Sequence, residues 1–482
     1  MPILLRVTTM SPLKTGTLPV GSAEPCHQPC HHCQAYTGVQ AAIITSRLRS
    51  TYMLTFAVYS PSLLWAWPNM RILPKPEKDA PTVEWLFLDL NSYFASVEQQ
   101  ERPELRGRPV GVVPLITDST CCIAASYEAK AYGVRTGTGV LEARTLCPHI
   151  ELVEARPKLY VEYHHRIIDA VNNCLPVTNV MSVDEMAIRL MGRERAVSNA
   201  TQLSIDLKTA IRSVGETLRC SVGLAPNRYL AKLASDMLKP DGLTVLLQRD
   251  LPRVLFRLNL RDLIGVSHAM EKRINNHGIM SVEQLCRLSP EQMRKVWGSV
   301  LGERMWHWLR GADFNDPESE RKSIGHQHVL GPEYRTRQQA FQVSQKLLQH
   351  AAARLRKLNL WAGGIGAYVR FMGDVEPWKA QRNISECQDS YTLQLHLTKL
   401  WESCPDTKPL QAGVWLFNLM PDEQHTLSLF DDNERQCRIS AAIDALNDRY
   451  GQGAVYFASM QSVLETAPTR IGFTSIPDLK EF

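Results

Sequence analysis

Three acidic residues in two short stretches of the chain could bind metal ions together. Asp89 follows an apolar run within residues 86–94, and Asp184 and Glu185 follow another within residues 181–186. Carboxylate oxygens are the ligands that hard Mg²⁺ or Mn²⁺ prefers, whereas zinc favours nitrogen and sulfur. Two such ions close together are suited to in-line phosphoryl transfer. Because acidic residues at a strand end are also common in turns and solvated rims, neither stretch alone identifies a site.

The elements that position these acids are predicted to be two β-strands. Residues 85–88 are bulky and uncharged, which is typical of a buried strand. Residues 177–183 are β-branched and apolar enough for a second strand, in a hairpin that carries the two later acids. If the two strands pair, we expect all three carboxylates to converge at one spot, where only a nearby cation would keep them ionised together.

The composition indicates a globular protein with room for several domains. The chain has 482 residues, of which 44% are hydrophobic and 21% charged. A net charge of +5 is compatible with a nucleic-acid partner. The twelve cysteines are mostly scattered, which favours reduced thiols in a cytosolic compartment. The longest apolar stretch, residues 54–67, is too short and too broken to span a bilayer, so we expect no membrane partner.

Residues 1–80 differ from the rest of the chain, with a single acid before Glu77. Cysteines and histidines alternate there, and they are Cys26, His27, Cys30, His31, His32 and Cys33. A zinc site is one interpretation, although C-x3-C-x2-C is not a usual zinc spacing. An organellar transit peptide is another. We favour a third, that this N-terminal extension is disordered or not part of the native protein and that Met70 is a natural start.

The remaining pattern alternates helices and strands. We expect a helix to begin after Asp89, capped by Asn91 or Ser92. Predicted helices cover residues 160–175, 200–216, 226–237, 338–358 and 440–450, and predicted strands cover residues 109–113, 121–126, 220–224, 361–371 and 413–419.

Several motifs in a fixed order resemble the Y-family translesion DNA polymerases, in particular the bacterial SOS-mutagenesis and DinB-type branch. They are DLNSYFASVE from residue 89, RPVGVV from 108, SYEAKAYGVRTGTGVLEA from 126, MSVDE from 181 and VGLAPNRYLAKLASDMLKPDG from 222. The resemblance extends from about residue 82 to the C-terminus. It implies an α+β fold shaped as a right-hand polymerase with palm, small fingers, helical thumb and a C-terminal α/β little-finger domain.

The resemblance also implies domain limits. The palm would comprise residues 81–92 and 159–245, the fingers 93–158, the thumb 246–320, the little finger 321–420 and a C-terminal tail 421–482.

In this family the three carboxylates hold two Mg²⁺ ions, with Mn²⁺ as a substitute, and the Leu90 carbonyl would be a further ligand. Phe94 matches the steric gate, a ring that clashes with the 2′-hydroxyl of a ribonucleotide, and Tyr93 would pack beside it. Core packing of the first helical turn is the alternative role for Phe94.

The triphosphate of the incoming nucleotide would contact Tyr127, Lys130 and Lys239. Lys130 stands where the family more often has Arg, and a lysine offers a point charge without a bidentate fork. Ala124 and Ala125 precede Ser126 where relatives often have a Thr, which removes one hydroxyl. Lys232, in the helix before Lys239, is interpreted as structural, and without the motif Lys239 itself would be a solvated turn lysine.

The C-terminal half is predicted to bind DNA. Residues 263–279 resemble a helix-hairpin-helix, whose backbone amides bind a phosphate, although Ser267 replaces the usual second Gly. Between Lys322 and Arg370 there are eight Lys or Arg and one acid, which indicates binding to a phosphate backbone.

A short apolar motif follows the basic domain. Leu427, Leu429 and Phe430 resemble the anchors of the bacterial sliding-clamp binding peptide. Thr426 stands where that pattern begins with Gln, and a buried strand or helix cap is the alternative.

We therefore expect a translesion DNA-directed DNA polymerase. Its partners would be primer–template DNA, dNTPs, the sliding clamp and SOS-mutagenesis accessory subunits, in the cytoplasm at the nucleoid. A non-catalytic DNA- and clamp-binding scaffold in a mutagenesis complex is the alternative, although the chain keeps all three carboxylates. A metal-dependent nuclease is a third hypothesis, but it would need neither a steric gate nor a separate basic domain.

Overall fold

The computed structural model describes residues 80–314, 321–425 and 433–467, with a few positions beyond residue 467. The cysteine- and histidine-rich N-terminal segment lies outside these residues, and so do the predictions made for it. The same holds for Leu427, Leu429 and Phe430 of the expected clamp-binding motif.

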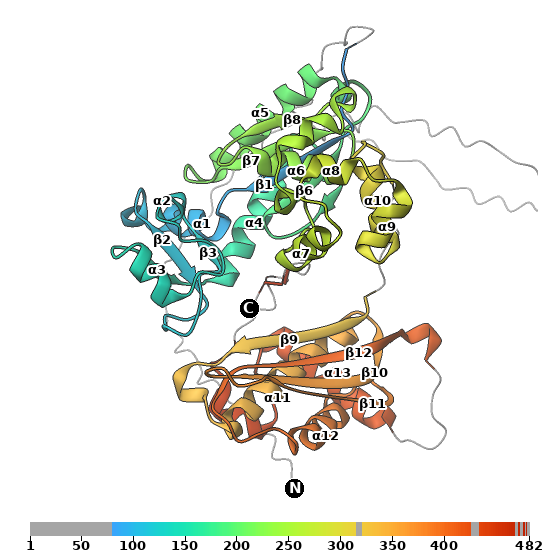
Figure 1. Ribbon diagram of the computed structural model, residues 1–482. Coiled ribbons are helices and arrows are strands. Elements are labelled where there is room, and N and C mark those ends of the chain that lie inside the picture. The colour runs from blue at the N-terminus through green and yellow to red at the C-terminus, as the bar shows by residue number, and fades with distance from the viewer. Residues whose placement is uncertain are drawn as a thin grey trace, which may run out of the picture. The chain divides into compact units, whose positions relative to one another are not determined.

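A five-stranded sheet is the centre of the first part of the chain, with strand order β5–β6–β1–β7–β8 (Figure 1). The strands are β1 Trp85–Leu90, β5 Asn179–Val180, β6 Glu185–Arg189, β7 Cys220–Ala225 and β8 Leu243–Val245. β1 is antiparallel to both of its neighbours, β6 and β7. Every residue of β1 is buried, as its uncharged sequence predicts.

The side chains of β1 enter two different cores. Successive residues of a strand point to opposite faces. Leu86 and Leu88 accordingly pack with α4 and α5, whereas Trp85 and Phe87 pack with α6. Asp89 follows the alternation and faces α6. The helices are α4 Pro157–Asn172, α5 Val197–Val214 and α6 Arg228–Met237, which confirms the predicted helices there within a few residues.

The predicted strand over residues 177–183 is mostly wrong. Only Asn179 and Val180 are in β5, and β1 pairs instead with β6, which begins at Glu185. The intervening residues turn sharply, because the Met181 amide donates to the Glu185 carbonyl at 2.9 Å. The hairpin itself is confirmed, but the acids lie at its turn and at the start of its second strand.

The chain between α1 and α4 forms a smaller three-stranded sheet, in the order β3–β2–β4. Its elements are α1 Tyr93–Glu101, η2 Pro103–Leu105, β2 Val110–Val113, β3 Ala124–Ala125, α2 Tyr127–Ala131, α3 Val140–Leu146 and β4 Glu151–Glu154. The strand predicted over residues 121–126 is shorter than expected. Its first part pairs with a loop, where the Gly137 amide donates to the Cys122 carbonyl at 2.8 Å.

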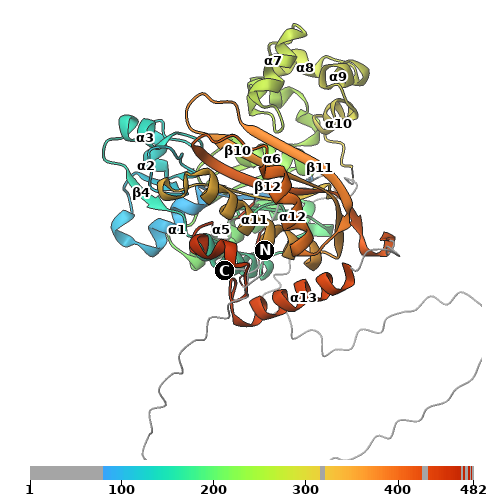
Figure 2. The same ribbon diagram turned by 90° about the horizontal axis from the view of Figure 1, so that it is seen from below.

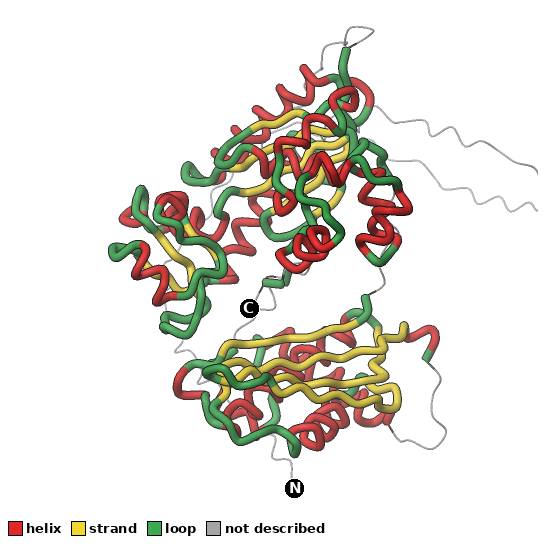
Figure 3. Tube along the Cα trace, in the orientation of Figure 1, coloured by secondary structure: helices red, strands yellow, loops and turns green. Residues whose placement is uncertain are grey.

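The stretch after β8 consists of short helices joined by loops, as predicted (Figure 3). These are η4 Gln248–Asp250, η5 Arg253–Arg257, η6 Leu260–Asp262, α7 His268–Asn276, α8 Val282–Cys286, α9 Pro290–Trp297 and α10 Val300–Trp308. Ser267 caps α7, because its hydroxyl accepts from the Met270 amide at 3.4 Å. The serine found in place of a second Gly thus still begins a helix.

The C-terminal part contains a four-stranded antiparallel sheet in the order β11–β10–β12–β9. Both α11 and α12 cover one face of it (Figures 1 and 2). The elements are β9 Ser323–Val329, η7 Pro332–Tyr334, α11 Arg337–Lys357, β10 Leu360–Phe371, β11 Trp378–Cys387, α12 Ser390–Trp401, β12 Pro409–Pro421, η8 Asp422–Gln424, α13 Asn433–Tyr450 and η9 Ala458–Val463. None of the described helices is long and apolar enough to cross a membrane.

Close packing of β7 against α6 gives a prediction about stability. A Cβ on Gly223 would lie 2.0 Å from the Ala231 carbonyl oxygen and 2.5 Å from the Ser235 amide nitrogen. Because backbone cannot move aside cheaply, we expect Gly223→Ala to destabilise the protein by about 1–3 kcal/mol. Scanning calorimetry should therefore show a lower midpoint of thermal unfolding. Gly139→Ala is the control, since a Cβ there meets nothing within 4 Å. Equal midpoints for the two variants would contradict the packing.

Candidate active site

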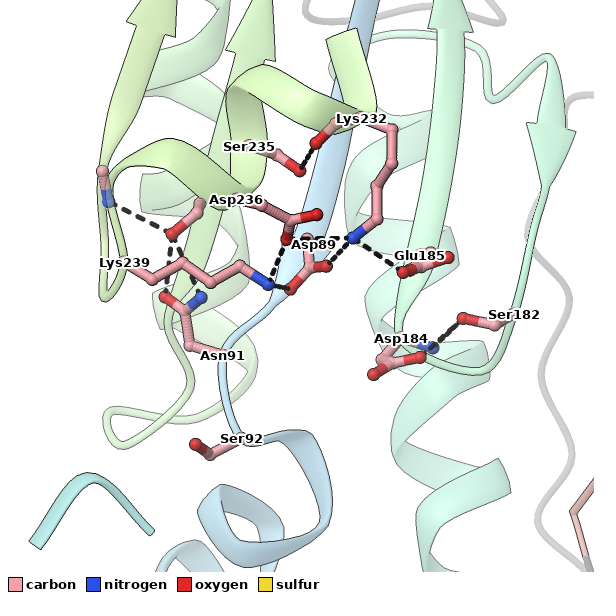
Figure 4. A network of polar contacts seen from close by, with 12 residues as sticks. Asp89, Asn91, Ser92, Ser182, Asp184, Glu185, Lys232, Ser235, Asp236 and Lys239 are labelled. Atoms are coloured by element: carbon pink, nitrogen blue, oxygen red, sulfur yellow. Dashed lines mark hydrogen bonds and ion pairs between the residues drawn. The ribbon is translucent and has the colours of Figure 1, made fainter. Parts of the chain in front are cut away.

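The three predicted carboxylates lie together where β1 ends and β6 begins (Figure 4). Asp89 of β1 is directly opposite Glu185 of β6 in the ladder. The Leu90 amide donates to the Asp184 carbonyl at 2.8 Å, which joins the β1 end to the hairpin turn. Because the strands are antiparallel, residues ninety-odd positions apart in the chain become neighbours.

Two lysines provide the positive charge beside these acids. The Lys232 ammonium of α6 lies 2.5 Å from the Asp89 Oδ2 atom and 2.8 Å from the Glu185 Oε1 atom. The Lys239 ammonium lies 2.6 Å from the Asp89 Oδ1 atom. Both also contact Asp236, at 3.1 and 2.8 Å. The interpretation of Lys232 as purely structural is therefore incomplete, because its charge is within the carboxylate cluster.

The environment of the acids differs from one to the next. Burial raises the pKa of both Asp184 and Glu185, while the neighbouring ammonium of Lys232 works against this rise. Asp184 accepts a 2.5 Å hydrogen bond from the Ser182 hydroxyl. Among the residues that the structure describes, no lysine or arginine forms an ion pair with Asp184. Its carboxylate is therefore the member of the cluster with the least compensation.

The chemistry of the cluster fits divalent cations. Within the described parts of the chain, no three His, Cys, Asp or Glu side chains form a ready-made metal cage. The positive charge beside the acids comes from lysine, since the Lys232 ammonium pairs with both Asp89 and Glu185. With Asp236, the cluster contains four carboxylates and two ammonium groups, which leaves an excess of negative charge when all are ionised. Oxygen donors with excess negative charge suit Mg²⁺ or Mn²⁺.

The predicted phosphate-binding residues lie near the same carboxylates. The Lys130 ammonium donates to the Ser92 hydroxyl at 2.7 Å and lies 4.4 Å from the centre of the Tyr127 ring. Burial lowers the pKa of Lys130, and the nearby charge of Lys239 lowers it further. Two cations that repel one another are suited to an anion that would bind both.

The predicted cap of α1 is wrong in its chemistry. Ser92 is the N-cap residue, but its side chain makes no capping hydrogen bond and its φ is 48°. The hydroxyl contacts Lys130 instead. Ser126 does cap a helix, since its buried hydroxyl accepts from the Ala129 amide at the start of α2.

The Phe94 ring is half-buried and stacks on Tyr160 of α4, with ring centroids 4.4 Å apart and planes 13° apart. Tyr93 is buried, and its hydroxyl donates to the Tyr160 carbonyl at 2.7 Å. The Tyr160 hydroxyl in turn donates to Glu98, which Arg156 binds through two nitrogens. Phe94 therefore rests on a rigid aromatic support, and Tyr93 belongs to that support.

Sequence reasoning missed Tyr160, Glu98 and the site contacts of Lys232. Tyr160 and Glu98 are 62 positions apart, so no local spacing indicates their contact. For Lys232 a signal was present, because it pairs with Asp236 one helical turn later on the face of α6 towards β1. Asp89, Phe94, Lys130, Asp184, Glu185, Lys232 and Lys239 all line one pocket.

Two stretches of the chain match one protein family. Residues 88–236 match the impB/mucB/samB family, and residues 321–429 match the C-terminal domain of that family. The first stretch contains the carboxylates and Lys232.

The chain is also similar to named proteins over most of their length. It is 36% identical over 388 residues to DNA polymerase IV of Moorella thermoacetica, which covers 77% of this chain and 95% of the relative. DNA polymerase IV of Pelotomaculum thermopropionicum is 33% identical over 381 residues, with 77% and 93% covered. A solved Y-family DNA polymerase chimera matches with a TM-score of 0.60 at 23% identity, over 70% of this chain and 99% of that one. This last likeness concerns the fold.

The charge of the cluster gives a prediction about metal binding. We expect Asp184→Asn to weaken Mn²⁺ binding by roughly 10-fold or more, because an amide keeps the shape of the side chain but loses its charge. Electron paramagnetic resonance of free Mn²⁺ during titration measures this affinity. Asp374→Asn, at an exposed position outside the pocket, is the control and should bind like the unaltered protein. Equal affinities for both variants would argue against a metal site at Asp184.

Proposed function

Because the chain belongs to the impB/mucB/samB family of Y-family translesion DNA polymerases, we propose that it extends primers past damaged bases at the carboxylate cluster described above. It is a DNA-directed DNA polymerase with the mixed helix-and-sheet fold of that family. The observation that supports this site is that Asp89, Asp184 and Glu185 lie at one place, where the lysines of α6 and of the following turn pair with Asp89 and Glu185.

Two Mg²⁺ or Mn²⁺ ions would be held by the three carboxylates and the Leu90 carbonyl. When bound, such ions lower the pKa of a primer 3′-hydroxyl and stabilise the charge of the triphosphate. The protein's own groups do the rest. The Lys239 ammonium pairs with Asp89 and can pair with the phosphates instead. There its positive charge would offset the negative charge of the leaving pyrophosphate. Lys130 and Tyr127, which contact each other in α2, would also bind the phosphates.

Phe94 acts as the gate for the sugar in this proposal. Its ring lines the pocket that also contains the carboxylates, and the stack on Tyr160 prevents it from moving away from a 2′-hydroxyl. Discrimination of this kind works by a clash that only the wrong substrate meets. The gate role is therefore compatible with the packing role, since the packing of the Phe94 ring on Tyr160 is what would hold the ring in place.

The domain limits given from the sequence are part of the proposal. The five-stranded sheet would be the palm, the three-stranded sheet the fingers, the short helices the thumb and the four-stranded sheet the little finger. Primer–template DNA and dNTPs are the substrates that a DNA polymerase requires. We further propose that residues 427–430 bind the sliding clamp, that accessory subunits join at damaged sites, and that the protein works in the cytoplasm at the nucleoid.

A non-catalytic scaffold gains no support from the described residues. A scaffold would not need two lysines paired with Asp89 and Glu185 next to a third carboxylate, yet this arrangement is present. Membership of a polymerase family likewise speaks against the nuclease hypothesis.

Primer extension tests the proposed function. The purified protein with Mg²⁺ and dNTPs should extend a primer on a plain template and past an abasic site. We expect Asp184→Ala to reduce the rate by on the order of 10²-fold or more, because it removes a group that stabilises transition-state charge. Intact DNA binding by the variant is the control for folding. Extension by Asp184→Ala at the rate of the unaltered protein would refute this site.

Sugar selection tests the role of Phe94. We expect Phe94→Val to lower the preference for dNTPs over rNTPs by about 10-fold or more, the scale on which a few carbon atoms in a pocket discriminate. We expect Tyr160→Leu to act in the same direction more weakly, since it leaves the gate but loosens its support. The ratio of kcat/KM for the two sugars measures the effect. Phe314→Val, at an exposed ring outside the pocket, is the matched control. An unchanged ratio in Phe94→Val would remove the gate from the proposal.

A further inference from the structure

Lys239 lies in a turn that contacts the buried side chains of Asn91, just after β1, and Ser221, in β7. The turn connects α6 to β8 and comprises residues 238–242. It is tight, because a Cβ on Gly242 would lie 1.9 Å from the Leu238 carbonyl oxygen. Asp241 adopts a φ of 56°, a left-handed conformation that is uncommon for residues other than glycine. Such a turn needs contacts from outside to keep its shape.

Asn91 supplies the first of these contacts. It lies two positions after Asp89 and is 2% exposed. Its Oδ1 atom accepts from the Asp241 amide at 2.7 Å, and its Nδ2 group donates to the Ser221 hydroxyl at 3.1 Å. Figure 4 shows the Asn91 side chain directed to the turn that carries Lys239.

Ser221 of β7 supplies the others and is fully buried. Its hydroxyl lies 3.2 Å from the Leu238 carbonyl oxygen and accepts from the Gly242 amide at 3.3 Å. Together the two side chains reach backbone groups on both sides of Lys239. Removal of either side chain is costly, because the buried backbone groups of the turn that it contacts would be left without a hydrogen-bond partner.

The outer side of the turn is held by charge. The Asp241 carboxylate accepts from Lys208 at 2.8 Å and also pairs with Arg212. Lys208 is 8% exposed and donates to the Cys220 carbonyl as well. The turn is thus held by the side chains of Asn91 and Ser221 and by two basic side chains of α5. The Lys239 side chain itself extends to the carboxylates.

We propose that Asn91 and Ser221 are positioning residues that hold the 238–242 turn, so that the Lys239 ammonium is set at the triphosphate site. This inference rests on the proposed function. Asp89 in β1 and Asn91 just after it would then together set the distance between carboxylate and ammonium. Neither residue touches substrate in this proposal.

Kinetics with paired variants test the inference. Asn91→Ala and Ser221→Ala should each lower kcat/KM for dNTPs by roughly 10- to 100-fold, the cost of a displacement of about 1 Å in a positioned group. The affinity for primer–template DNA alone should not change. Asn199→Ala is the matched control, since Asn199 is also a buried palm asparagine, on α5, and its Nδ2 group donates to the Arg193 carbonyl, which lies outside the turn.

A double variant distinguishes positioning from a general loss of structure. If Asn91 acts through Lys239, then Asn91→Ala adds little further loss in a Lys239→Ala background. Multiplied losses would show that Asn91 acts independently of Lys239 and would overturn the inference. Ser221→Ala, which deletes one hydroxyl, carries the same test if Asn91→Ala does not fold.

Equilibrium binding of a non-hydrolysable dNTP to the protein–DNA complex separates this inference from the proposed function. A protein that neither binds the nucleotide nor extends a primer would overturn both. A second outcome would overturn the inference alone. In it the protein binds the nucleotide and extends a primer, and Lys239→Ala weakens nucleotide binding, but Asn91→Ala and Ser221→Ala do not. Weaker nucleotide binding in all three variants, with Asn199→Ala unchanged, is the expected result.

Discussion

The ion pairs of Asp89 with Lys232 and Lys239 allow a group of acids to be built into the end of a buried strand. Burial disfavours an uncompensated charge by several kcal/mol, and Asp89 is 5% exposed. The alternation along β1 turns Asp89 to the face that α6 covers, and α6 supplies one lysine directly and the other through the turn after it. The rest of the site follows from this arrangement, because the antiparallel partner β6 brings Glu185 to the same place.

One short segment, residues 89–94, contacts several different parts of the site. The six residues from the end of β1 to the start of α1 include Asp89, Asn91, Ser92 and Phe94, which contact Lys239, its turn, Lys130 and Tyr160 respectively. Ser92 adopts a left-handed conformation between them. A non-glycine residue with positive φ is commonly kept where function needs a sharp change of direction. Here the change turns the chain from β1 into α1, which carries Phe94.

How far the sequence predicted these features depended on the range of each interaction. The apolar run of β1 and the periodicity of α5, α6 and α11 are local signals, and these elements were predicted within a few residues. The second strand was misplaced because a β-branched run precedes the turn, whereas the ladder is formed by the residues after it. β11 was missed because a run of three exposed polar residues, 381–383, interrupts the alternation of apolar and polar residues along it. The position of the three acids followed from motif order, but the role of Lys232 depends on the packing of α6 over β1, which no single stretch encodes.

Lys239 is in contact with Asp89 and Asp236, so two carboxylates balance the positive charge that is proposed for the phosphates. A triphosphate that arrives with divalent ions would bring both the anion for Lys239 and the cations for Asp89. Each exchange is weaker alone, because each alone would leave a buried charge without a partner. The two are favourable together, and we infer that this coupling makes the site respond to a metal-bound nucleotide more than to either component. The rigid turn under Lys239 serves that coupling, since an ammonium held at a fixed distance from Asp89 can change partner without a large loss of conformational entropy.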